Sequence, residues 1–122
     1  MIKSFTDLKA WRESHKLCLM VYRATESFPK NEEFALSSQI KRAVTSVTSN
    51  IAEGFGRSSK KDKEHFYVMA SGSLYEVKNQ LILAKDLGYI SNREFHSIAD
   101  QANNAHRLLY GLLKSHKSIP NS

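Results

Sequence analysis

The sequence predicts an all-α protein, an antiparallel up-down-up-down four-helix bundle. Apolar residues recur three or four positions apart through four segments, at about 6–27, 31–55, 60–87 and 91–117. No alternating strand pattern of useful length is visible, and the chain has only two prolines and five glycines. Because the links between these segments are short, each helix is expected to turn back along the one before it.

The first two helices have recognisable ends. Asp7 lies near the start of the first helix, where a negative charge suits the positive end of the helix dipole, and Pro29 stops it. Asn31 is the expected N-cap of the second helix, and Gly54 and Gly56 are expected to end it.

The third and fourth helices also carry end signals. Gly88 follows the last turn of the third helix in the position of a C-cap glycine. Ser91 and Glu94 have the spacing of a capping box at the start of the fourth. Residues 1–117 are therefore expected to form one domain, and 118–122 a flexible C-terminal tail.

Composition places the chain among ordinary globular proteins, with 41% hydrophobic and 25% charged residues in 122. The single cysteine, Cys18, excludes an internal disulfide and suits a reducing, cytoplasmic compartment. No apolar run approaches the roughly 18 residues that cross a bilayer, so no membrane partner is expected. A net charge of +6 favours acidic partners such as nucleic acid.

A polar row runs beside the apolar stripe of the second helix. Ser46, Asn50 and Glu53 are spaced i, i+4, i+7 and share one helix face. Buried polar groups need hydrogen-bond partners, which predicts a structural network completed by a matching row on the third helix. Its expected members are Gln39, Arg42, Ser46, Asn50, Glu53, Ser73, Glu76 and Gln80.

Folding the second and third helices into a hairpin predicts which residues face each other. With the loop centred near Ser59, facing residue numbers sum to about 118, within one turn. Ser46 then lies opposite Gly72, and Arg42 near Glu76. Glycine inside a helix costs about 1 kcal/mol relative to alanine, so Gly72 indicates a gap beside a polar side chain or a close helix contact.

The same helices carry a set of motifs that match one known family. The motifs are Phe5-Thr6-Asp7-Leu8-Lys9-Ala10-Trp11, Val21-Tyr22, Phe28-Pro29, Gln39-Ile40-Lys41-Arg42-Ala43, Ser46, Ser49-Asn50-Ile51-Ala52-Glu53-Gly54, Ala70-Ser71-Gly72-Ser73-Leu74-Tyr75-Glu76 and Leu87-Gly88-Tyr89. With these, the chain resembles the small four-helix-bundle proteins encoded within intervening sequences of bacterial 23S ribosomal RNA genes. The match covers residues 5 to about 113.

The resemblance implies a homopentameric barrel of four-helix bundles, in a family whose molecular role is poorly settled. It also points to a relative, the accessory protein of diversity-generating retroelements, which is similar in fold and assembly and binds nucleic acid and a reverse transcriptase. A protein partner is therefore a further expectation. The chain departs from the pattern at Thr48, where many relatives have proline, so no proline kink is implied here.

No catalytic constellation is recognisable, and no enzyme activity is expected. The row around Ser46 has no histidine within a turn to act as a base, and no strand-turn-helix elbow presents a nucleophile. Gly54-Phe55-Gly56 lacks the preceding strand and third glycine of a dinucleotide-binding fingerprint. No cofactor is therefore expected.

No metal site is expected either. A di-iron bundle needs Glu-x-x-His on two helices, and the chain has none; Asp62-x-x-His65 is one poor substitute at a helix start. The remaining histidines are expected at the surface or at an interface. They are His15, His96, His106 and His116.

The connection after the second helix is basic. Arg57, Lys60, Lys61 and Lys63 are opposed locally only by Asp62, and they are the expected nucleic-acid-binding residues. No base-reading module is recognisable, so contact with RNA or DNA would be weak and directed at the backbone. Four tyrosines are candidates for base stacking, for subunit contacts or for burial: Tyr67, Tyr75, Tyr89 and Tyr110.

Two functions of different classes remain open. One is a homo-oligomer, with five copies by resemblance, that binds nucleic acid without sequence specificity. Apolar residues Leu19 and Met20 on the far side of the first helix favour an interface. The other is a protein-interaction or structural scaffold with no nucleic-acid role, whose positive charge is incidental.

Overall fold

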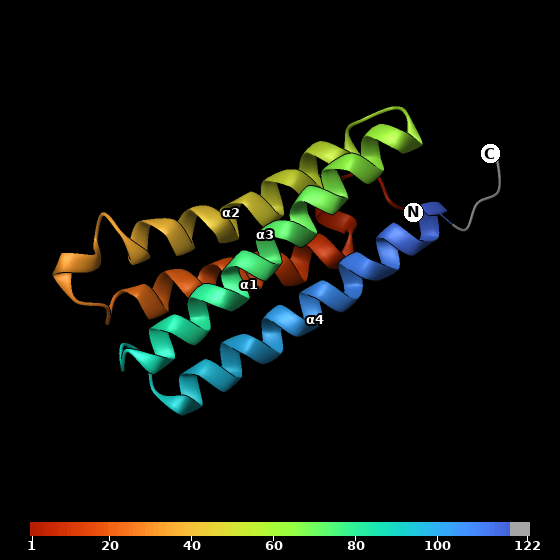
Figure 1. The fold of residues 1–122 in the computed structure, drawn as a ribbon. Helices are drawn as coiled ribbons and strands as arrows, with labels where there is room; N and C mark the ends of the chain where they lie inside the picture. The colour runs from red at the N-terminus through yellow and green to blue at the C-terminus, as the bar shows by residue number, and fades with distance from the viewer. Residues whose placement is uncertain (118–122) are drawn as a thin grey trace.

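The computed structural model describes residues 1–117 as four long α-helices and two short 3₁₀ turns (Figure 1). The helices are α1 (Lys9–Thr25), α2 (Leu36–Phe55), α3 (Lys60–Asp86) and α4 (Asn92–Lys117). The turns are Phe5–Asp7 and Lys30–Glu32. No strand occurs in residues 1–117, and the expected tail, 118–122, lies outside the described residues.

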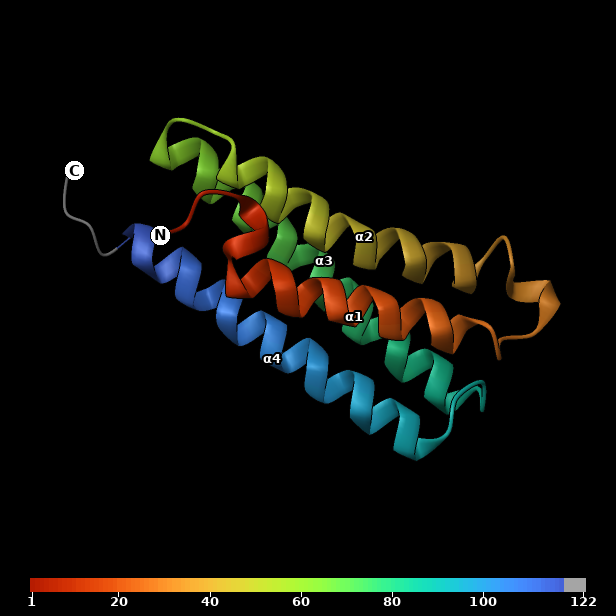
Figure 2. The same cartoon turned by 180° about the vertical axis from the view of Figure 1, so that it is seen from behind.

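Successive helices lie side by side and run in opposite directions, as the two opposite views show (Figures 1 and 2). Each helix packs against two neighbours, in the cyclic order α1, α2, α3, α4. Between α2 and α3, Ser46 meets Ser73 while Gly54, further along α2, meets Tyr67, earlier in α3. The predicted all-α bundle is confirmed.

The apolar stripes of the four helices meet along the bundle axis. Full burial of an aliphatic side chain contributes about 1.5–3 kcal/mol, so this seam is the main source of stability. Its members that are at most 1% exposed include Leu17 and Val21 of α1, Ile40, Val44, Val47 and Ile51 of α2, Leu74, Val77 and Leu81 of α3, and Ala102, Ala105 and Leu109 of α4.

The N-terminal helix starts later than the pattern predicts. Asp7 lies in the Phe5–Asp7 turn and not in the first turn of α1; its carboxylate accepts hydrogen bonds from the backbone N–H groups of Lys3 and Ser4, at 2.9 and 3.1 Å. These bonds lower the pKa of Asp7 and close the Phe5–Asp7 turn. Leu8 is extended and buried, and α1 begins after it.

The second helix also starts later, at Leu36, so Asn31 is not its N-cap. The residues before α2 form the Lys30–Glu32 turn, in which the Glu32 carboxylate is held by hydrogen bonds to Leu36 and Tyr89. The carboxylate accepts from the Leu36 N–H at 3.3 Å and from the Tyr89 hydroxyl at 2.6 Å. This contact ties the connection between α1 and α2 to the one between α3 and α4.

The starts of α3 and α4, the end of α3 and the C-cap of α2 at Gly56 agree with the sequence. Ser59 caps α3 by accepting from the Asp62 N–H at 3.1 Å, and Ser91 accepts from the Glu94 N–H at the start of α4 at 3.1 Å. Gly88 follows α3 with a φ of 80°, a left-handed conformation that favours glycine. Helix α2 runs without a break through Thr48.

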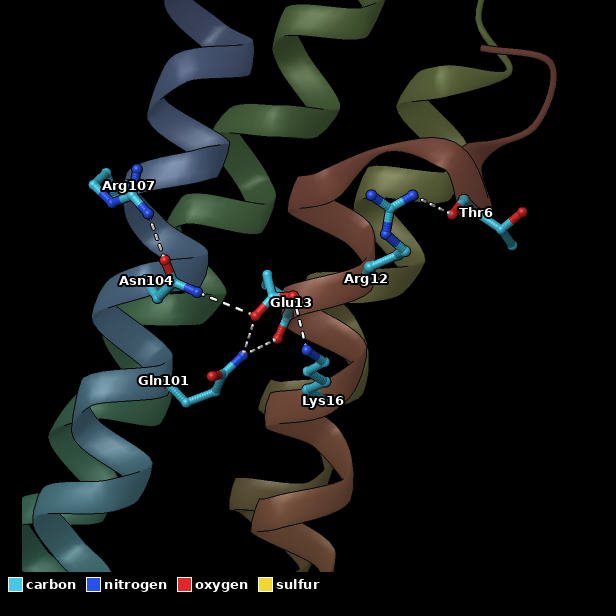
Figure 3. A network of polar contacts seen from close by, with 7 residues as sticks. All are labelled: Thr6, Arg12, Glu13, Lys16, Gln101, Asn104 and Arg107. Atoms are coloured by element: carbon cyan, nitrogen blue, oxygen red, sulfur yellow. Dashed lines mark hydrogen bonds and ion pairs between the residues drawn. The ribbon is translucent and has the colours of Figure 1, made fainter. Parts of the chain in front are cut away.

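One polar network between α1 and α4 is not visible in the sequence pattern (Figure 3). The Glu13 carboxylate accepts from the side-chain amides of Gln101 and Asn104, both at 3.1 Å, and forms an ion pair with Lys16 at 3.2 Å. Gln101 also donates to the Glu13 backbone carbonyl at 2.8 Å. The bond from Gln101 lowers the pKa of Glu13. The network fixes how α4 lies along α1.

Two glycines inside helices have opposite surroundings. A Cβ at Gly54 would lie 2.7 Å from Cε1 of the buried Tyr67 ring and 3.0 Å from Cβ of Phe66. Gly54 therefore permits a close approach of α3 and does not end α2, which continues to Phe55. A Cβ at Gly72 would meet nothing within 4 Å, so the close helix contact, one of the two alternatives for Gly72, is absent and the position is open.

This contrast predicts opposite effects of one substitution. Gly72→Ala is expected to raise the free energy of unfolding by about 0.5–1 kcal/mol, because alanine favours the helix and has room. Gly54→Ala is expected to lower the free energy of unfolding by about 1 kcal/mol. Here the cost of displacing the Tyr67 ring is larger than the gain from alanine's preference for the helix. Thermal and urea unfolding of the two variants measure this. An equal gain at both positions would contradict the packing described at Gly54.

Candidate functional site

The basic residues of the α2–α3 connection lie together at one end of the bundle, where α2 passes into α3 (Figure 1). Lys60 and Lys61 are the first two residues of α3; Lys61 is exposed and Lys60 is half-buried. Arg57 precedes α3, and Lys63 occupies its first turn. The structure thus brings the four predicted cations into one region.

Two of these cations are already engaged by the helix end. The Lys63 ammonium donates to the backbone carbonyls of Phe55 and Gly54, at 2.7 and 3.3 Å, and so caps the C-terminus of α2. Arg57 pairs with Glu53 at 2.9 Å, and its guanidinium lies 4.6 Å from the centre of the Phe66 ring. Part of the positive charge of the connection is therefore directed at the protein itself, while Lys61 is exposed.

An open hollow of about 580 Å³ lies beside this end of α2, lined by Ser49, Ala52, Glu53, Gly56 and Arg57. Its two charged groups form the ion pair just described. An exposed pair of this kind contributes little stability. A phosphate approaching the hollow would have to compete with the Glu53 carboxylate for Arg57.

The centre of the predicted polar row joins α2 to α3. The hydroxyls of Ser46 and Ser73 lie 2.9 Å apart, one residue from the predicted register. The Asn50 side-chain amide donates to the backbone carbonyl of Ser46 at 2.9 Å and to its hydroxyl at 3.0 Å. Asn50 therefore reaches α3 through Ser46, and all three side chains are half-buried.

The outer members of the row do not join this group. Gln80 donates to Glu76 along α3 at 3.5 Å, and the buried Oε1 of Gln80 has no hydrogen-bond partner. Within the described residues, Arg42 and Glu76 form no ion pair, and both are exposed, as is Gln39. The eight residues thus form separate groups and not one shared network.

A buried histidine is the main feature that sequence reasoning missed. His106 was expected at the surface or an interface, but it is only 4% exposed, between α3 and α4. Its Nδ1 lies 2.7 Å from the Lys78 ammonium, and its Nε2 lies 2.8 Å from the Ser71 hydroxyl. Its spacing in the sequence could have predicted this burial, because His106 lies one turn after Ala102 and three residues before Leu109, both of which are buried.

The two hydrogen bonds determine the state of the imidazole. The Lys78 ammonium can only donate, so Nδ1 accepts and the proton of the neutral ring is on Nε2, which donates to Ser71. Desolvation, and to a lesser extent the Lys78 charge, lowers the pKa of His106 from 6.5 to about 4. Because Nε2 already carries a proton, His106 cannot serve as the base for Ser71 in this arrangement.

Other chemistry-bearing groups do not assemble into a site in the described residues. No group of three or more His, Cys, Asp or Glu side chains is placed to hold a metal there. Cys18 is buried, donates to the Val44 carbonyl at 3.2 Å, and has a pKa raised by burial. No helix in the described range is long and apolar enough to cross a membrane.

The low pKa of His106 predicts that stability depends on pH. The unfolded state takes up a proton near pH 6.5, but the folded state only near pH 4. The contribution of His106 to the free energy of unfolding is therefore complete above pH 6.5 and is lost as pH falls towards 4. The loss is about 1 kcal/mol per pH unit.

His106→Gln cannot titrate, so the stability advantage of the parent over this variant should shrink as pH falls. Urea unfolding of both proteins across this range measures the difference. Parallel curves would contradict a neutral buried imidazole.

Comparison with known proteins agrees with the fold. The family model for the 23S rRNA-intervening sequence protein matches residues 6–111. A solved structure of a protein of unknown function from the S23 ribosomal protein family of Bacteroides thetaiotaomicron VPI-5482 is similar, with a TM-score of 0.78. The two are 24% identical, over 86% of this chain and 95% of that chain. No curated protein matches. Since the family model covers most of its length, the chain belongs to the 23S rRNA-intervening sequence protein family.

Proposed function

We propose that this chain acts by binding and not by catalysis, as a homo-oligomer that holds nucleic acid weakly and without sequence specificity. The observation that carries the proposal is the net charge of +6 together with the lysines at the start of α3. The single reduced cysteine suits a cytoplasmic location for such a protein.

The α2–α3 end of the bundle has the chemistry for phosphate contacts. Lys61 is exposed beside Lys60, and the N-terminus of α3 adds the positive end of a helix dipole. Lysine contacts of this kind attract the phosphate backbone without reading bases. The S23 ribosomal protein family name of the structural neighbour is in keeping with this partner class.

Repeated copies would strengthen a weak contact. On α3 the apolar side chains of Val68, Met69 and Leu83 are exposed, and so is that of Leu87, directly after the helix. On α1, Leu19 is exposed as expected, but Met20 packs against the core. The outer face of α3 is therefore the better candidate for a subunit interface. The resemblance implies five copies, each with its own basic end.

The assembly is tested by mass. Light scattering after size exclusion is expected to give about five times the 13.9 kDa of one chain. Leu83→Glu places a charge on the outer face of α3 and should give a smaller species with unchanged helicity. A parent protein that stays monomeric at micromolar concentration would overturn the proposed assembly.

The binding is tested by charge reversal. The Lys60→Glu, Lys61→Glu double variant should lose most binding to RNA or DNA at low salt, with its helices intact, because acidic residues suit a helix N-terminus. Affinity of the parent should fall steeply as salt rises. Fluorescence anisotropy with a labelled oligonucleotide measures both effects.

A matched control comes from the opposite end of the bundle. Lys30→Glu makes the same change of charge as Lys61→Glu alone, at an exposed residue between α1 and α2, and it should cost far less affinity than that single variant. If Lys30→Glu is as damaging as Lys61→Glu, only net charge matters and the proposed site is wrong.

One observation favours a second candidate function, a protein-interaction or structural scaffold. Cations at the α2–α3 end are used internally, Lys63 by backbone carbonyls and Arg57 by Glu53. A parent protein that binds no oligonucleotide even at low salt would make the scaffold the better account.

A further inference from the structure

A second cationic surface lies along the outer side of the α3/α4 pair, around the buried His106. It consists of two hollows. One, of about 190 Å³, is lined by Lys78, Leu81, Ile82, Phe95, Ala99 and Asn103. The other, of about 360 Å³, is lined by Tyr110, Gly111, Leu113 and Lys114. We call this surface the α3/α4 groove.

Two tyrosines, Tyr75 and the Tyr110 that lines the second hollow, pack against His106 on one side and are exposed on the other. The rings of Tyr75 and Tyr110 lie 4.6 and 5.5 Å from the His106 ring, measured between ring centres, yet each residue is 57% exposed. The Tyr110 phenol raises the pKa of Tyr75, by charge repulsion and a hydrogen bond, which places the two phenols next to each other. Rings held in this way lose little freedom when a flat ligand stacks on them.

The surroundings of the tyrosines leave space for such a ligand. Gly72 lies nearly one turn before Tyr75, and Gly111 directly follows Tyr110. A Cβ at either glycine would meet nothing within 4 Å. No side chain therefore rises from these two positions to cover the exposed parts of the rings.

Lysines alternate with aromatic rings along the groove. The Lys78 ammonium lies 5.4 Å from the centre of the Tyr75 ring, and that of Lys85 lies 4.6 Å from the Phe95 ring. Lys114 is exposed at the hollow next to Tyr110. Lys78 and Lys85 are seven residues apart, about 10 Å along α3. The cations are thus spread along the groove and do not form a single cluster.

The groove has almost no opposing charge. Asp86 pairs with Lys85 at 3.6 Å, and within the described part of the chain no Asp or Glu lines either hollow. Lys78 donates one hydrogen to His106 and has two more to offer. Lys78 is partly buried, which lowers its pKa, so an anion next to it would offset part of the cost of desolvating its charge.

Exposed aromatic faces interleaved with lysines match one class of ligand best. An unpaired nucleic-acid strand carries bases that stack on aromatic rings and a phosphate at every step. A duplex keeps its bases stacked on each other, so no base face is available to stack on the tyrosine rings. An acidic peptide would satisfy the lysines but would leave the tyrosine rings without a matching face.

We propose that the α3/α4 groove binds single-stranded nucleic acid, with bases stacked on Tyr75 and Tyr110 and phosphates held by Lys78 and Lys114. The inference rests on the nucleic-acid binding proposed above, and it adds a surface that distinguishes unpaired strands from duplex. It also assigns a role to His106, which positions Lys78 and both rings without touching the ligand.

The test compares strands that differ only in their bases. The probes are fluorescent oligouridine of about 12 nucleotides, the corresponding DNA, an abasic strand of equal length and a duplex. Tyr75→Leu with Tyr110→Leu should weaken binding to the RNA and to the DNA about tenfold or more. Binding to the abasic strand should be unchanged. Lys114→Gln should reduce the salt dependence for all strands by about one phosphate contact.

The chain supplies a matched control in Tyr22. This tyrosine on α1 is also exposed and has a lysine over its ring, since the Lys41 ammonium lies 5.3 Å from the ring centre. Tyr22→Leu removes an equivalent side chain outside the groove and should leave binding unchanged. Circular dichroism establishes whether each variant is folded. If the double tyrosine variant does not fold, the Tyr75→Leu and Tyr110→Leu single variants are used in the same binding assay.

The outcomes separate this proposal from the one on which it rests. If the tyrosine variants bind oligouridine like the parent while the Lys60→Glu, Lys61→Glu variant does not, the groove proposal fails and the basic end remains. Equal loss for oligouridine and the abasic strand overturns stacking. A change of oligomer mass in the tyrosine variants would show that the groove contacts a second copy, which overturns the proposal. A parent that binds no strand overturns both.

Discussion

The close approach of α2 and α3 at Gly54 determines how one whole end of the molecule is built. The absence of a side chain at Gly54 lets the Tyr67 ring lie against the α2 backbone, and Tyr67 is only 1% exposed. The bond between Ser46 and Ser73 holds the same register two turns away. With α3 at this distance, Lys63 reaches the last carbonyls of α2. The direction in which the basic connection leaves the bundle follows from that packing.

Much of the fold could be predicted from local patterns, because helical spacing and end residues are short-range signals. Gly88 and Ser91 end and start their helices as expected, since each acts on its own neighbours. Asn31 did not become a cap, because Glu32 bonds to a tyrosine 57 residues away. No local pattern contains that contact.

The candidate site was less predictable, because its side chains have partners on other helices. Histidine is a polar residue type, so the sequence predicts exposure at His106. Only the fold shows that Ser71 and Lys78 can satisfy both of its nitrogens. Arg42 and Glu76 were paired by register alone, yet an exposed ion pair is worth about 0–1 kcal/mol and nothing in the packing enforces it.

Net charge was a similarly incomplete guide. The cations of this chain repeatedly lie over aromatic rings, as Lys41 does over Tyr22 and Arg57 over Phe66. Such a cation keeps its charge but gives up some of its freedom and hydration. A sum of charges therefore says little about where an anion binds. The arrangement of rings and lysines in the folded chain says more.

Polar contacts also explain why four similar helices adopt one arrangement. Apolar seams tolerate a helix that slides by one turn, because one buried aliphatic side chain replaces another. Each pair of adjacent helices carries a polar contact that would not survive such a slide: Cys18 to the Val44 carbonyl, Ser46 to Ser73, His106 to Ser71 and Glu13 to Gln101. A displaced helix would bury these groups without partners, at about 1–3 kcal/mol each. The polar groups thus exclude alternative registers that the apolar core alone would allow.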